Sequence, residues 1–261
     1  MQLRDKVILL TGATGGLGAA LAAEFRTCGA KLVLTGRDAV KLAAHATPGD
    51  AIIPGDLCDE TFRARLIDEC VQRHGRIDVL VNNAGIGLYA STDRAAMPLV
   101  RRMFELNFFA PLDLAQRAIP FMRAQGGGTI VNISSIAGRL TLPWFTLYSA
   151  SKFALCSFTE GVRMEFSHEG IHAMLVLPGY IHTAFQDNVL GGTPPESIRK
   201  AKRFAVTPEE CAREVVAGLE RGARTVVTPF SGKLLMALAR RMPGVVESRL
   251  AGANREANRR S

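Results

Sequence analysis

The chain has 261 residues and carries 32 Lys and Arg against 24 Asp and Glu, a formal net charge of +8. Its 48% hydrophobic content and mean hydropathy of +0.12 are typical of a globular protein and exclude a disordered chain. No apolar run reaches the roughly 18 residues that span a bilayer, no export signal is recognisable, and five cysteines in no close pairing indicate neither a disulfide framework nor a metal site, so a cytoplasmic protein is expected.

Short apolar runs alternate with amphipathic segments along the whole chain. The runs that we expect to be buried strands are Val7–Leu10, Lys31–Leu34, Ala51–Ile53, Ile77–Val81, Thr129–Ile133, Ile171–Leu177 and Thr225–Val227. The segments with helical spacing are Leu17–Cys28, Ala39–His45, Thr61–His74, Leu99–Arg123, Tyr148–His168 and Pro208–Arg221. This alternation predicts an α/β fold: a doubly wound parallel sheet of about seven strands with helices on both faces.

Two regions depart from the alternation. Residues 184–206 form a long, Gly- and Pro-containing connection between a strand and a helix, and we expect a flap over a site there. No linker divides the chain before residue 231, so residues 1–230, with the flap, are predicted to form one domain. Residues 231–261 are predicted to form a basic C-terminal helix and tail.

The first strand leads into a glycine-rich turn and then a helix. Glycines in such a turn let the backbone approach a phosphate closely, and the helix N-terminus supplies N–H donors. The turn contains Gly12, Thr14, Gly15, Gly16, Leu17 and Gly18. Its position indicates a dinucleotide-binding turn, although the spacing departs from the general pattern of the motif.

The end of the second strand indicates which nucleotide is bound. An acidic residue there accepts the ribose hydroxyls of NAD, whereas an Arg accommodates the 2′-phosphate of NADP. The strand ends in Gly36-Arg37, and the Arg37 guanidinium suits a phosphate. NADP is therefore favoured. NAD stays possible if Asp38 faces the ribose instead.

The next two strands also end in polar residues at the edge where a cofactor would lie. Asp56, followed by Leu57, either accepts a hydrogen bond from an adenine amino group or closes an Asx turn. Asn83, Ala84 and Gly85 are small or polar and follow the fourth strand, where strand carboxyl ends form a binding crevice.

The residues expected to carry the chemistry surround Tyr148. Tyr148 and Lys152 are four apart at the start of a helix and therefore share one face, where the ammonium would lower the pKa of the phenol. Ser135 follows the fifth strand and can donate to a carbonyl oxygen. Asn107 precedes Pro111 by four residues, so its backbone carbonyl lacks a helical donor and could hold a water that relays protons to Lys152.

Taken together, these motifs resemble those of the classical short-chain dehydrogenases/reductases, from Thr11 to about Arg221. The resemblance implies a Rossmann-like fold and hydride transfer between NADP(H) and a carbonyl/alcohol pair. It implies that Tyr148 is the acid/base, that Lys152 lowers its pKa and binds the nicotinamide ribose, and that Ser135 orients the substrate carbonyl. Asn107 would support the proton relay.

The resemblance also extends the expected cofactor site to the segment after the sixth strand, where Ile181 and Thr183 would contact the nicotinamide carboxamide. Thr14 replaces the basic residue that many NADP-preferring relatives carry in the turn, so the preference for NADP depends on Arg37. The residues expected to bind the cofactor are Gly12, Thr14, Gly15, Gly16, Leu17, Gly18, Arg37, Asp56, Leu57, Asn83, Ala84, Gly85, Tyr148, Lys152, Pro178, Gly179, Ile181 and Thr183.

The C-terminal segment carries much of the positive charge. Residues 240–261 hold six Arg and two Glu, a net charge of +4, after an apolar stretch. The favoured interpretation is an oligomer-packing helix followed by a disordered tail. The alternative is peripheral contact with an anionic membrane.

The expected partners are a small-molecule carbonyl or alcohol and further copies of the chain, as a dimer or a tetramer. The C-terminal segment differs from the compact endings of tetrameric relatives. No motif supports nucleic-acid binding. A protein that binds NADP to sense redox state, without significant turnover, is the alternative function.

Overall fold

The computed structural model describes residues 1–186, 188–191 and 205–258, and it contains a seven-stranded parallel sheet. In spatial order the strands are β3 (Ala51–Pro54), β2 (Lys31–Gly36), β1 (Val7–Thr11), β4 (Val79–Asn82), β6 (Gly128–Ile133), β7 (Ile171–Pro178) and β9 (Thr225–Thr228). The strand order reverses between β1 and β4, the point at which doubly wound sheets bind nucleotides. The predicted single Rossmann-like domain with seven strands is confirmed.

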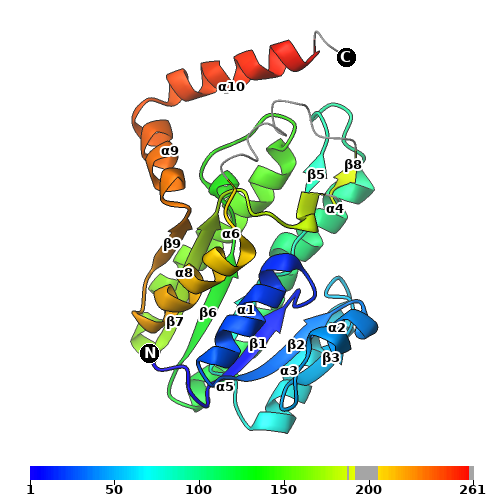
Figure 1. The fold of residues 1–261 in the computed structure, drawn as a ribbon, viewed down its shortest axis with the longest axis vertical. Coiled ribbons are helices and arrows are strands. Elements are labelled where there is room, and N and C mark those ends of the chain that lie inside the picture. Colours follow the sequence, from blue (N-terminus) through cyan, green and yellow to red (C-terminus); the bar gives the residue numbers. More distant parts are fainter. Residues whose placement is uncertain (187, 192–204, 259–261) are drawn as a thin grey trace.

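Helices cover both faces of the sheet (Figure 1). One core joins the sheet to α1 (Gly16–Thr27), α2 (Ala39–His45) and α8 (Pro208–Glu220). The other joins it to α3 (Glu60–His74), α5 (Ala110–Ala124) and α6 (Thr146–Phe166). Because both faces are covered, the strands consist of nearly continuous apolar residues, as in β1, where all five residues are buried.

Local sequence signals determine where several helices begin and end. The Asp59 side chain accepts a hydrogen bond from the Thr61 amide at the start of α3, and Gly75 ends that helix with a φ of 72°. Thr207 and Glu210 form a reciprocal capping box at the start of α8. These caps fix where α3 begins and ends and where α8 begins, and so they set the lengths of the connections to the neighbouring strands.

The prediction of one helix over Leu99–Arg123 is wrong in detail. The structure has α4 (Met97–Phe104), a π-helical segment (Glu105–Phe109) and then α5. The wider turn lies directly before Pro111, which has no N–H to continue the regular hydrogen-bond pattern. Asn107 lies within this π-helical segment.

A two-stranded parallel sheet, not predicted from the sequence, joins β5 (Leu88–Tyr89) to β8 (Leu190–Gly191). It connects the start of the predicted flap to the chain that follows β4. A 3₁₀ turn (Ala184–Gln186) begins the flap. A bridge pairs Ile181, just before the flap, with Val206 at its end. Residues 187 and 192–204 of the flap lie outside the described residues.

After β9 the chain forms α9 (Phe230–Arg241) and α10 (Pro243–Asn258), and Figure 1 shows α10 lying across the end of the molecule, away from the sheet. The predicted basic C-terminal segment therefore contains two helices, the second of which continues to Asn258. Within the described part of the chain, no helix is both long and apolar enough to cross a membrane.

Candidate functional site

The glycine-rich turn between β1 and α1 is packed so closely that side chains would not fit. A Cβ on Gly18 would lie 2.1 Å from the Gly12 carbonyl oxygen, and one on Gly12, whose φ is +66°, would lie 2.9 Å from the Ala84 Cα. Gly15 is the N-cap of α1, has no side-chain cap, and no acidic residue follows in the first turn. The N-terminus of α1 is therefore suited to an anion.

Asn83 holds this turn against the end of β4. Its Nδ2 donates to the carbonyls of Thr11 at 2.9 Å and Gly12 at 3.1 Å. The Thr11 hydroxyl oxygen accepts hydrogen bonds from the amides of Asn83 and Ala84, both at 3.0 Å. The turn after β1 and the turn after β4 therefore form one rigid unit.

At the end of β2, Arg37 is exposed and lines the same cavity as the glycine turn. The neighbouring Asp38 is the N-cap of α2 and accepts a hydrogen bond from the Lys41 amide at 3.0 Å. That bond is also the main cause of a lowered pKa of the Asp38 carboxyl. Lys41 lines this end of the cavity as well, a contribution that the sequence analysis missed.

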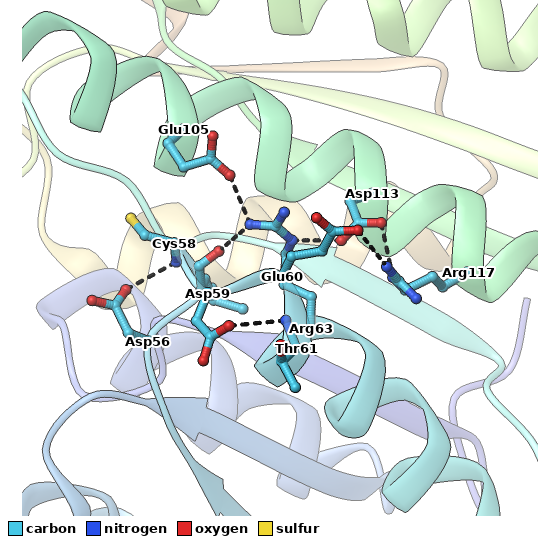
Figure 2. A network of polar contacts seen from close by, with 10 residues as sticks. Asp56, Cys58, Asp59, Glu60, Thr61, Arg63, Glu105, Asp113 and Arg117 are labelled. Atoms are coloured by element: carbon cyan, nitrogen blue, oxygen red, sulfur yellow. Dashed lines mark hydrogen bonds and ion pairs between the residues drawn. The ribbon is translucent and has the colours of Figure 1, made fainter.

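The loop after β3 combines Asp56 with a buried ion-pair network. Asp56 accepts a hydrogen bond from the Cys58 amide at 2.9 Å, which is the Asx turn that the sequence left open. Figure 2 shows the Arg63 guanidinium between Glu105 and Asp113, and it also donates to the Leu57 carbonyl at 2.7 Å. Arg63 therefore connects the loop containing Asp56 and Leu57 to the π-helical segment.

Ser135, Tyr148 and Lys152 lie together at the carboxyl end of β6. The Ser135 hydroxyl lies close enough to Tyr148 to affect the pKa of its phenol, donates to the Pro178 carbonyl at 3.4 Å and accepts from the Ala137 amide at 3.1 Å. Lys152 Nζ lies 5.8 Å from the centroid of the Tyr148 ring and donates to the Ile133 carbonyl at 3.0 Å. Ser135, Tyr148 and Lys152 therefore line the same part of the cavity.

The pKa values of Tyr148 and Lys152 differ from the sequence-based expectation. Burial raises the pKa of Tyr148 above its usual range, and the hydrogen bond from Ser135 only partly opposes this. Burial also lowers the pKa of Lys152 to about 8. Both groups lie inside the protein, where desolvation disfavours each charged form. In the protein alone, Tyr148 is therefore a protonated donor.

The Asn107 side chain does not line the cavity but joins two segments that do. Its Nδ2 donates to the Ile86 carbonyl at 2.9 Å and to the Ser151 hydroxyl at 3.1 Å, while its Oδ1 accepts from the Ile86 amide at 2.9 Å. A Cβ on Gly85 would lie 3.2 Å from Asn107 Oδ1 and 3.4 Å from Lys152 Nζ. Asn107 therefore joins the chain after β4 to the helix that carries Lys152.

The segment after β7 closes the site from the other side. The Gly179 amide donates to the Thr228 carbonyl at 2.7 Å, which fixes the Pro178-Gly179 turn. A Cβ on Gly16 would lie 2.6 Å from Thr183 Cγ2, so this segment and the glycine turn touch. Ile181 and Thr183 both line the cavity.

A single cavity of about 740 Å³ is lined by every residue that the sequence nominated except Asn107. The sequence analysis did not identify Tyr89, Phe145 or Phe185, which belong to an aromatic wall of this cavity. In a sequence, aromatic residues that line a cavity cannot be distinguished from aromatic residues of the hydrophobic core. The wall contains Tyr89, Phe145, Tyr180 and Phe185.

Comparisons with known proteins agree with this geometry. A family model for short chain dehydrogenases matches residues 6–192. "Dehydrogenase/reductase SDR family protein 7-like" of Anopheles gambiae is 34% identical over 87% of this chain and 75% of that protein. "Dehydrogenase/reductase SDR family member 7B" of Bos taurus is 33% identical over 86% of this chain and 74% of that protein.

Solved structures show the same relationship. A short chain dehydrogenase from Burkholderia cenocepacia in complex with NADP has a TM-score of 0.81 at 28% identity, covering 96% of this chain and 99% of that one. A short-chain dehydrogenase from Sphingobium yanoikuyae in complex with NADPH has a TM-score of 0.79 at 26% identity, covering 93% and 95%. The chain therefore belongs to the short-chain dehydrogenase/reductase family, whose members are oxidoreductases acting on CH–OH or C=O groups.

Proposed function

We propose that the chain transfers a hydride between NADP(H) and a carbonyl/alcohol pair, using Ser135, Tyr148, Lys152 and Asn107. The observation that carries the proposal is the single cavity that joins the glycine turn to Ser135, Tyr148 and Lys152. The glycine turn fits a dinucleotide, because Cβ atoms on Gly12 and Gly18 would collide with backbone atoms and the N-terminus of α1 has no side-chain cap.

A bound nicotinamide supplies or accepts the hydride, and the protein moves the proton. In the reductive direction the Tyr148 hydroxyl protonates the carbonyl oxygen as that oxygen gains negative charge. The Ser135 hydroxyl orients the same oxygen. Lys152 stabilises the phenolate that Tyr148 leaves behind, and Asn107, beside Lys152, supports the return of a proton from solvent. The redox-sensor alternative predicts NADPH binding without ketone-dependent NADPH oxidation, so an assay with a panel of ketones tests the proposal directly.

The preference for NADP over NAD depends on Arg37. Asp38, the rival for the ribose, already caps α2, whereas Arg37 and Lys41 supply positive charge at this end of the cavity. The printed names of the Burkholderia cenocepacia and Sphingobium yanoikuyae structures include NADP and NADPH, which supports the same choice.

Replacing Arg37 with Ala should lower kcat/KM for NADPH by about 10- to 100-fold, because a charged hydrogen bond is worth about 1.5–3 kcal/mol. NADH has no 2′-phosphate, so its kcat/KM should change much less. Steady-state kinetics with both cofactors measure the ratio of kcat/KM for NADPH to kcat/KM for NADH. Lys41→Gln is the matched variant, because it removes the other cation at this end of the cavity. An Arg37→Ala enzyme that keeps the NADPH preference of the wild type would contradict the proposal.

We also propose that the chain is a homo-oligomer; the alternative to packing of its C-terminal helices in that oligomer is contact with an anionic membrane surface. Phe109, Phe121 and Phe153 expose aromatic rings around α5 and α6, as expected of a subunit interface. On α9 and α10, exposed apolar residues lie beside exposed cations. The apolar residues are Phe230, Leu234, Leu238, Met242 and Val245, and the cations are Lys233, Arg240 and Arg241.

The membrane alternative predicts that the full chain sediments with vesicles containing phosphatidylserine and is released by salt. Leu234→Ser with Leu238→Ser should reduce sedimentation about tenfold or more, since each buried leucine contributes about 1.5–3 kcal/mol. Val40→Ser, which removes an exposed apolar side chain elsewhere, is the control. Equal sedimentation of both variants would contradict membrane contact. So would a dimer in light scattering that is lost in the Leu234→Ser, Leu238→Ser variant, because a second copy would then cover these apolar residues.

A further inference from the structure

The cavity is aromatic at the end where a substrate would meet Tyr148. The rings of Tyr89 and Phe145 stack with centroids 4.4 Å apart and planes inclined by 20°. Phe145 also stacks on Tyr148, at 4.2 Å and 26°. The Phe185 ring lies 6.0 Å from Tyr148 and is tilted by 59°. A flat apolar group fits such a wall, because aromatic rings favour offset and edge contacts with one another.

Charge is concentrated at the opposite end of the cavity. Arg37 and Lys41 line the end near β2, and Arg102 lies close enough to Cys58 to affect the pKa of that thiol. At the aromatic end, the one charged side chain among the described lining residues is Lys152, which lies beneath the Tyr148 ring. The uncharged lining residues around Tyr148 include Tyr89, Phe145 and Phe185. Among the described residues of this wall, a carboxylate on the substrate would therefore find no cation other than Lys152.

The three tyrosines of the chain all line this cavity. Burial raises the pKa of Tyr89, Tyr148 and Tyr180, so each keeps its proton near neutral pH. Tyr148 and Tyr180 lie close enough to Tyr89 to affect its pKa as well. Tyr180 is half-buried and follows Gly179. Within the described residues, no hydrogen bond involves its hydroxyl, which makes it a donor for a bound oxygen atom.

We propose that the substrate is an uncharged carbonyl compound with a flat apolar group and a second oxygen, which accepts a hydrogen bond from the Tyr180 hydroxyl while the reacting oxygen lies at Tyr148. This substrate class rests on the proposed NADPH-dependent reduction. One hydride from NADPH and one proton from Tyr148 convert one C=O to one CH–OH, and NADPH becomes NADP⁺. The second oxygen is unchanged.

Two matched pairs of aryl ketones test the charge and the second oxygen separately. Methyl benzoylformate and benzoylformate differ in a carboxylate charge, and kcat/KM should be at least about 30-fold higher for the ester, as expected when a buried site offers no partner for a charge. Benzil and deoxybenzoin differ in one carbonyl oxygen. Tyr180→Phe should lower the benzil-to-deoxybenzoin ratio of kcat/KM about tenfold, the effect of one lost hydrogen bond.

Phe185→Leu is the control, because it alters the same wall without removing a hydroxyl; it should lower kcat/KM for benzil and deoxybenzoin alike. Equal use of benzoylformate and its ester would overturn the uncharged substrate, and equal losses with both ketones in Tyr180→Phe would overturn the role of that hydroxyl. Fluorescence of Trp144, the single tryptophan and the neighbour of Phe145, reports binding without turnover. Tighter binding of the ester with no NADPH oxidation would contradict the proposed function alone; equal binding would contradict the substrate class.

Discussion

Replacing Tyr148 with Phe should lower kcat by about a thousandfold while leaving the Kd for NADPH close to that of the wild type. The hydroxyl is the proton donor in the proposed reduction, and positioned acid–base groups contribute about 10²- to 10⁴-fold. The ring should keep its place, because it stacks on Phe145 at 4.2 Å and is almost wholly buried. The change therefore removes the proton and little else.

Tyr89→Phe is a matched control for this variant. It removes a phenolic hydroxyl from the other end of the same three-ring stack. Its turnover should exceed that of Tyr148→Phe by about a hundredfold if Tyr148 is the acid. Stopped-flow NADPH oxidation measures turnover, and fluorescence titration measures cofactor binding. A Tyr148→Phe enzyme with wild-type turnover would refute the assignment, whereas loss of NADPH binding would show that the ring is needed to shape the cavity.

The sheet was predictable because its strands are short apolar runs separated by amphipathic helices. A strand such as β1 is buried on both faces, and all of its residues before Thr11 are apolar, so the run is easily recognised. The segment Leu99–Arg123 shows the limit of this reasoning. Helical periodicity is almost the same for α-helices and for a single wide turn, so the pattern could not reveal the π-helical segment before Pro111.

The lining of the cavity was predictable where it consists of motif residues. Glycines and asparagines at strand ends, together with a Tyr-Lys pair at the start of a helix, are rare enough in combination to be recognised. The aromatic wall was not predictable, because Tyr89 comes from β5 and Phe185 from a 3₁₀ turn almost a hundred positions later. The rise in the pKa of Tyr148 was not predictable either, because it results from burial, and burial depends on tertiary packing that the spacing of residues in the sequence does not show.

The glycine turn provides the sharpest test of the cofactor site in the free protein. Gly18 and Gly15 both lie in this turn, but their surroundings differ. A Cβ on Gly18 would lie 2.1 Å from the Gly12 carbonyl oxygen and 2.9 Å from Asn83 Nδ2. A Cβ on Gly15 would lie 3.5 Å from the same carbonyl oxygen, which is an ordinary contact.

Gly18→Ala should therefore destabilise the protein by about 3 kcal/mol, the upper part of the range for overpacking, and lower its Tm by roughly 6–12 °C. The added methyl must displace the Gly12 carbonyl and break its hydrogen bond with Asn83. The shifted turn should also lower kcat/KM with NADPH by about a hundredfold, because a displacement near 1 Å in a reacting complex can have an effect of that size.

Gly15→Ala is the matched control, and its cost in the free protein should stay below about 1 kcal/mol, since Gly15 has an extended backbone that any residue adopts. Urea denaturation of both variants without cofactor separates the effect on packing from any contact that the new methyl makes with the pyrophosphate. Equal stabilities would mean that the turn moves freely away from the new methyl. The rigid unit formed by Thr11, Gly12 and Asn83 could then not be what shapes the cofactor site.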